Sequence, residues 1–147
     1  MSDDGVQQKT YWVQTFSETT WREFLESGGT VTGFGHTRWS YIQQQLKPGH
    51  ILLCYLNGLA KWAGILEVAS EPYPDLAPIW KNKIFPCRVD VKVIIALPLE
   101  KAISVHALRN RLSIFKTKHW GLYFITSPAK WKLEDGRIVE AALLAAK

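Results

Sequence analysis

The stretch KPGHILLCYLNGLAKWAGILEV, residues 47–68, decides the fold. Its apolar run Ile51–Leu56 has no polar interruption and has the length of one strand. The dipeptide Asn57-Gly58 follows, which is the strongest short signal for a tight hairpin turn. Residues 62–68 then read as the returning strand. The pattern predicts a β-hairpin in the middle of the chain, and the other elements are placed around it.

Upstream of the hairpin, the pattern predicts a strand at residues 11–15 and a short extended or turn segment at residues 30–34, each followed by a helix. The first helix begins at a Ser17 cap and ends at two glycines, because glycine adopts the left-handed backbone that closes a helix. Thr37 is the expected cap of the second helix, and Pro48 stops it. Apolar residues at helical spacing mark the buried faces of these helices: Trp21, Phe24, Leu25, Trp39, Ile42 and Leu46.

Downstream, residues 71–86 contain four of the seven prolines and are predicted to form a long loop. Residues 88–93 alternate strictly between polar and apolar side chains, which is typical of a half-buried strand. We expect a short helix capped by Ser104, a last strand at residues 121–126 and a closing helix at residues 137–146. Short strands with helices at the edges of a small barrel indicate the α+β class.

The composition is that of one globular domain, with 147 residues, 47% hydrophobic and 21% charged. We expect a flexible lead at residues 1–10 and a single domain at residues 11–147. No run of about 18 apolar residues exists, so no membrane association is expected, and the polar N-terminal stretch favours a cytoplasmic location. Cys54 and Cys87 lie in strand-like segments without C-x-x-C spacing, which favours two buried thiols over a redox pair or a zinc site.

The net charge of +5 is distributed unevenly along the chain. Residues 1–80 carry five Lys/Arg and eight Asp/Glu, whereas residues 81–132 carry eleven Lys/Arg and two Asp/Glu. This asymmetry suggests a basic face that attracts a polyanion by releasing its counterions, although a lysine-rich solvated surface would produce the same count.

Catalytic signatures are absent from the sequence. There is no P-loop, no G-x-S-x-G turn and no H-E-x-x-H helix, and the four histidines are scattered. We therefore expect a protein that is not an enzyme and that needs no cofactor or metal.

Aromatic residues are unusually frequent, with seven tryptophans, five tyrosines and six phenylalanines. Four of the tryptophans lie on apolar faces of predicted elements and are assigned to the core: Trp12, Trp21, Trp39 and Trp62. Trp80 differs, because it lies in the proline-rich loop and is followed by Lys81 and Lys83. It is either an anchor of the loop or a platform on which a planar ligand stacks beside phosphate-binding charge.

Several motifs occur in the order found in a known domain. They are Tyr11-Trp12-Val13, Gly33-Phe34, the segment 47–56, Trp62 to Val68, Glu71-Pro72-Tyr73-Pro74-Asp75, and Pro86 to Lys92. With them, the chain resembles the EVE domain of the PUA-like superfamily, to which the YTH readers of modified bases are related. The resemblance covers nearly the whole chain, and it departs at His50, where an acidic residue usually follows Pro-Gly.

The resemblance implies a barrel whose pocket holds an extruded, often methylated base between aromatic walls. It puts Phe34, Trp80 and Phe85 on the walls, and the Gly33 backbone and the Ser17–Thr20 helix start at the base edge. Asp75 either accepts from an exocyclic amine or caps its loop. The candidate phosphate-binding residues beside this pocket are Lys81, Lys83, Arg88, Lys92 and Lys130.

These observations favour a module that binds DNA or RNA and recognises a modified base. Such a module is compatible with action through a partner protein. Two alternatives remain open. One is a binder of a small aromatic metabolite or free nucleotide in the same pocket. The other is an enzyme acting on nucleic acid, for which the sequence offers no general base or metal site.

Overall fold

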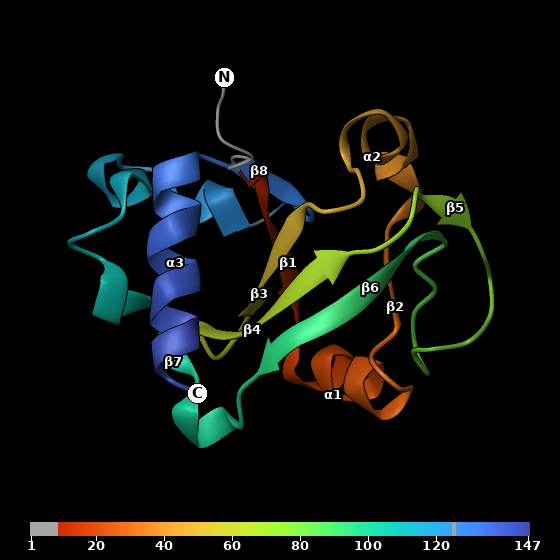
Figure 1. Ribbon diagram of the computed structural model, residues 1–147, viewed down its shortest axis with the longest axis horizontal. Coiled ribbons are helices and arrows are strands. Elements are labelled where there is room, and N and C mark those ends of the chain that lie inside the picture. The colour runs from red at the N-terminus through yellow and green to blue at the C-terminus, as the bar shows by residue number, and fades with distance from the viewer. Residues whose placement is uncertain (1–8, 125) are drawn as a thin grey trace, which may run out of the picture.

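The computed structural model of the protein describes residues 9–124 and 126–147 (Figure 1). The strands and α-helices, in chain order, are β1 (Tyr11–Phe16), α1 (Glu18–Glu26), β2 (Val31–Phe34), α2 (Trp39–Gln45), β3 (Ile51–Leu56), β4 (Lys61–Val68), β5 (Tyr73–Pro74), β6 (Cys87–Ala96), β7 (Ile103–Ser104), β8 (Ala129–Trp131) and α3 (Leu133–Ala145). Short 3₁₀ segments occupy His36–Arg38, Leu99–Lys101, Val105–Leu108, Ser113–Lys116 and Trp120–Phe124. Most of the predicted lead at residues 1–10 falls outside the described residues.

The strands form one mixed sheet in the order β2-β6-β4-β3-β1-β8, with β5 beside β6 and β7 beside β4. The hairpin predicted at residues 51–68 is its centre, as β3 and β4 pair antiparallel. β1 pairs with β3 in parallel, and α1, β2 and α2 form the long connection that a parallel pair requires. The sheet curls into a half-barrel with helices at its edges, which confirms the predicted α+β class.

Hydrophobic side chains are buried on both faces of this sheet. Alternation along β1 sends Tyr11 and Val13 into a core under α3, and Trp12 and Phe16 into a second core with residues of α1, α2 and β2. Figure 1 shows the corresponding layers, with α3 on one side of the sheet and α1 and α2 on the other. Gly136 lets α3 approach β1, because a Cβ there would lie 2.2 Å from the ring of Tyr11.

The first helix forms as the sequence predicts. Ser17 is its N-cap, and Ser17 and Thr20 cap each other's backbone N–H reciprocally. Gly28 and Gly29 end the segment with φ values of 114° and 68°, in the left-handed region that favours glycine. The predicted Thr37 cap of the second helix is wrong, because Thr37 lies inside a 3₁₀ turn that precedes α2.

The C-terminal third differs most from the prediction. Residues 120–124 form a 3₁₀ segment and not a strand. The last strand is β8, which begins five residues after this segment ends. The helix predicted from residue 104 is a single 3₁₀ turn, capped by the Ser104 side chain as expected. The closing helix begins at Leu133, four residues before the predicted start. Among the described residues, no helix combines the length and hydropathy needed to cross a membrane.

Cys54 and Cys87 are both buried and free, as the sequence predicts. Burial raises the pKa of both thiols, so neither is an activated nucleophile. Within the described ranges, no cluster of three or more His, Cys, Asp or Glu side chains is suitable for a metal ion.

Candidate functional site

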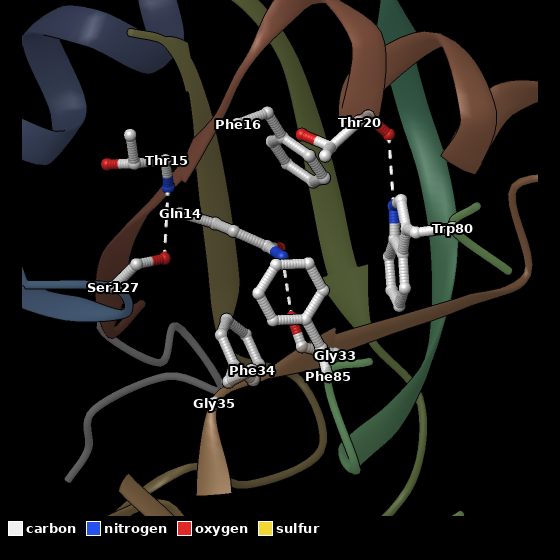
Figure 2. A pocket seen from close by; sticks show the side chains of 10 residues that line it. All are labelled: Gln14, Thr15, Phe16, Thr20, Gly33, Phe34, Gly35, Trp80, Phe85 and Ser127. Carbon is white, nitrogen blue, oxygen red and sulfur yellow. Dashed lines mark hydrogen bonds between the residues drawn. The ribbon is translucent and has the colours of Figure 1, made fainter. Parts of the chain in front are cut away.

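A small cavity lies where β1, α1, β2 and the loop between β5 and β6 meet (Figure 2). Its volume is about 80 Å³, which is room for several water molecules. Three phenylalanines and one tryptophan are among its lining residues. The lining residues are Gln14, Thr15, Phe16, Thr20, Gly33, Phe34, Gly35, Trp80, Phe85 and Ser127.

Trp80 is both an anchor of the loop and a wall of the cavity. Its side chain is 4% exposed, and its indole N–H donates to the carbonyl oxygen of Thr20 at 3.1 Å. The ring of Phe85 meets the indole edge to face, with 4.9 Å between ring centroids. The sequence left two roles open for Trp80, an anchor of the loop and a platform for a planar ligand. The two roles are compatible, because one edge of the indole is fixed to α1 while the side chain still lines the cavity.

Gly33 allows the loop to close against β2. A Cβ at this position would lie 2.5 Å from the carbonyl oxygen of Phe85, so any other residue would push the Phe85 segment outward. Phe34, the next residue, is 2% exposed and lines the same cavity. The glycine thus sets the distance between two aromatic walls, which lie on β2 and on the loop.

Gln14 forms a polar floor that the sequence reasoning missed. Its amide nitrogen donates to the Thr32 hydroxyl at 2.7 Å and to the Gly33 carbonyl at 3.3 Å. Its Oε1 atom is buried and has no hydrogen-bond partner. A signal was present, because alternation along residues 11–16 places Gln14 between Trp12 and Phe16 on one buried face, where a polar side chain is unexpected.

Contacts of the Ser127-Pro128 segment also involve residues that the sequence did not indicate. The Thr15 N–H donates to the Ser127 hydroxyl at 3.1 Å, which joins β1 to the segment that leads into β8. Arg38 donates to the Pro128 carbonyl at 2.8 Å and lies over the ring of Tyr41. These contacts are tertiary, and no spacing in the sequence connects residues 15 and 38 with residues 127 and 128.

The structure brings most of the predicted base-contacting residues together around this cavity, namely Thr20, Gly33, Phe34, Trp80 and Phe85. It leaves out two. Ser17 is exposed, and its hydroxyl caps the helix. Asp75 is also exposed, and its carboxylate accepts from the Ala77 N–H at 3.0 Å. Of the two roles considered for Asp75, the structure gives it the capping of its own loop.

The predicted phosphate-binding residues do not form one strip. Lys81 and Lys83 are exposed on the same loop as Trp80 and border a shallow groove of about 530 Å³ beside the cavity. Lys92 is exposed four residues beyond Arg88 on β6, about 13 Å further along the strand. Lys130 is exposed on β8, with its amino group 5.9 Å from the ring of Trp12.

Arg88 requires a correction. It is 1% exposed, and its guanidinium donates to the carbonyl oxygens of Phe85 at 2.6 Å and Ala77 at 2.7 Å. The alternation along β6 is as predicted, but the loop between β5 and β6 covers this side chain. Arg88 therefore holds the loop in place from beneath and does not face a phosphate in solution.

Comparison with solved structures identifies the fold. The YTH domain of Pho92, solved in complex with m6A, superposes with a TM-score of 0.71 at 14% identity, over 94% of this chain and 85% of that one. The Mmi1 YTH domain in complex with RNA gives 0.67 at 11%, over 99% and 85%. Rpa0253 from Rhodopseudomonas palustris gives 0.63 at 19%, over 94% and 95%. No family model and no curated protein matches the sequence.

Proposed function

We propose that this protein is a nucleic-acid-binding module that takes a single modified base out of its strand and holds it between Phe34, Phe85 and Trp80. The observation that carries the proposal is the cavity itself, which is lined by aromatic residues of β2 and of a lysine-bearing loop and by Gln14, whose Oε1 has no hydrogen-bond partner. The fold adds support, since it is shared with YTH domains solved with m6A and with RNA.

The energy balance of such a site is favourable. Extruding one base from its stack costs a few kcal/mol. Stacking on an aromatic side chain returns about 1–3 kcal/mol per base, and hydrogen bonds to the base edge add to this. A methyl group on the base increases the apolar area buried against the rings, at about 0.8 kcal/mol for one carbon.

The cavity must widen to accept a base. Its volume of about 80 Å³ is smaller than the cavity of about 150 Å³ that binds benzene in an engineered protein core. Trp80 is held at its N–H, and Phe34 is buried in β2, whereas Phe85 is only half-buried and belongs to the loop. We infer that the Phe85 ring is the wall that moves when a base enters.

The exposed lysines on the loop are then available to bind the phosphate backbone of the nucleic acid. Lys81 follows Trp80 directly and Lys83 lies two residues further, so we expect a phosphate next to the extruded nucleotide to lie within reach of a flexible ammonium group. Their contribution is independent of sequence and decreases with salt. The lysines thus contribute affinity for any strand, whereas the cavity determines the preference for one base.

The test is a binding panel of RNA and DNA oligonucleotides that carry one central plain or methylated base, measured at two salt concentrations. We expect salt-dependent binding with a preference for one modified base, and we expect Trp80→Ala to abolish that preference. Equal affinity for plain and modified oligonucleotides would overturn the proposal. Salt-independent binding of the free nucleoside, with no gain from the strand, would instead favour a receptor for a small aromatic molecule.

A further inference from the structure

Gln14, which lines the cavity, carries a buried acceptor without a donor. Among the described residues, four buried side-chain polar atoms lack a hydrogen-bond partner, and only Gln14 Oε1 belongs to a residue that lines this cavity. Gln14 is 3% exposed, and Figure 2 shows its side chain reaching from β1 toward the phenylalanine rings. A buried carbonyl without a donor is unfavourable, so this atom offers a hydrogen bond to whatever enters.

The orientation of the Gln14 amide follows from its neighbours. The Gly33 carbonyl oxygen lies 3.3 Å from the amide nitrogen and can only accept a hydrogen bond. Exchanging the oxygen and nitrogen of the amide would bring two acceptors together. The nitrogen must therefore face Gly33 and Thr32, and the oxygen is left unpaired.

We propose that Gln14 determines which bases the cavity accepts, by requiring an amino N–H that donates to its Oε1. This inference rests on the proposed function, and it specifies the ligand as a base whose exocyclic amino group retains at least one hydrogen, which is tested below in its adenine and cytosine forms. A base that presents no N–H to the Gln14 oxygen leaves this atom buried and unpaired, and that loss is what a polar site uses to reject an analogue.

The ligand test uses the unaltered protein and oligonucleotides that differ only at one central base. The adenine series contains N6-methyladenine, N6,N6-dimethyladenine and unsubstituted purine. The cytosine series contains 5-methylcytosine, its N4,N4-dimethyl derivative and 5-methylpyrimidin-2-one, which lacks the amino group. Within each series, one of the two analogues without an amino hydrogen is larger than the parent base and the other is smaller. If size governs binding, the two analogues differ in affinity in opposite directions, whereas if the hydrogen bond governs binding, both bind more weakly than the parent base.

We expect both analogues in the preferred series to bind about tenfold more weakly than the parent base. An affinity that follows size alone, with one analogue weaker and the other equal or stronger, would overturn the role of Gln14. So would a preferred base that carries no amino group. If no oligonucleotide in the panel shows a base preference, the proposed function fails and this inference fails with it.

The protein test uses Gln14→Met, which keeps the length of the side chain and removes the amide. We expect the preference for the amino-bearing base over its analogues to fall from about tenfold to within about twofold, while Lys81 and Lys83 still support salt-dependent binding. Thr32→Val is the matched control, because the Thr32 hydroxyl contacts only the amide nitrogen and Gly33 still orients the oxygen. An unchanged preference in a folded Gln14→Met, with Trp80→Ala still disruptive, overturns the inference and leaves the proposed function intact.

Discussion

The indole N–H of Trp80 donates to the carbonyl oxygen of Thr20 across 60 residues of sequence. The adjacent Lys81 N–H donates to a carboxylate oxygen of Glu23 at 3.3 Å, so the loop between β5 and β6 is fastened to α1 at two consecutive residues. A buried aromatic ring that is fixed at one edge keeps its orientation when a ligand arrives. This is the property that a stacking wall needs.

Trp80 permits a separation of its two roles. Trp80→Phe removes the hydrogen bond but keeps a ring, and we expect a loss of about 1 kcal/mol in stability with the base preference retained. Trp80→Ala removes the ring, and we expect a loss of about 3–5 kcal/mol together with the base preference. Urea denaturation and oligonucleotide binding measure the two effects. A Trp80→Phe protein without base preference would contradict the assignment of the ring as the stacking wall.

Arg88 is expected to act on stability and not on phosphate binding. Arg88→Met leaves the carbonyl oxygens of Phe85 and Ala77 without their charged donor, and we expect a loss of roughly 3 kcal/mol in the free energy of unfolding. Lys92→Met, on the same strand but exposed, is the control and should be nearly neutral. Urea denaturation of both proteins measures the difference. Equal stability of the two variants would show that Arg88 does not hold the loop.

Lys81 and Lys83 are expected to contribute to binding without selecting a base. For each of Lys81→Ala and Lys83→Ala, we expect the slope of log affinity against log salt to become shallower by about 0.7–0.9, with the ratio of modified to plain affinity unchanged. Lys101→Ala is the control, since Lys101 is exposed beyond the opposite end of β6. Salt titrations of oligonucleotide binding provide the slopes. If only Lys101→Ala made the slope shallower, the nucleic acid would bind elsewhere on the surface.

His50 is expected to make stability depend on pH. Its Nδ1 accepts from the Trp12 indole at 3.0 Å and from the Lys47 N–H at 3.2 Å, so the bonded ring is neutral. Burial lowers the pKa of His50, and the charges of Lys130 and Lys47 lower it further. The folded state therefore binds a proton less readily than the unfolded chain, whose histidine pKa is about 6.5.

The contribution of His50 is complete above about pH 6.5 and is lost as the pH falls below that value. Denaturant unfolding of the protein and of His50→Gln between about pH 5 and 8 measures it, and we expect the curve of the variant to be flatter on the acidic side. Parallel curves would mean that His50 titrates alike in the folded and unfolded states.

The sequence determined the elements whose signals are local. The apolar run of residues 51–56, the turn that begins at Asn57-Gly58 and the returning strand specify the central hairpin without help from distant residues, although the turn spans residues 57–60 and is longer than the tight turn predicted. The reciprocal cap of Ser17 and Thr20 likewise specifies the start of α1. Residues 120–124 have no such signal, and their apolar composition fits a strand as well as the packed 3₁₀ segment that they form.

The tertiary structure decided the candidate site, because contacts that close the cavity, such as those of Trp80 with Thr20 and of Gln14 with Gly33, join residues far apart in sequence. Alternation correctly predicted the side of β6 on which Arg88 lies, but only the path of the loop determined that this side is covered. The unpaired oxygen of Gln14 depends on the nearby Gly33 carbonyl, and the separation of the aromatic walls depends on the missing Cβ of Gly33. Local periodicity specifies the face of a strand on which a residue lies, whereas burial and hydrogen bonding depend on what packs against that face.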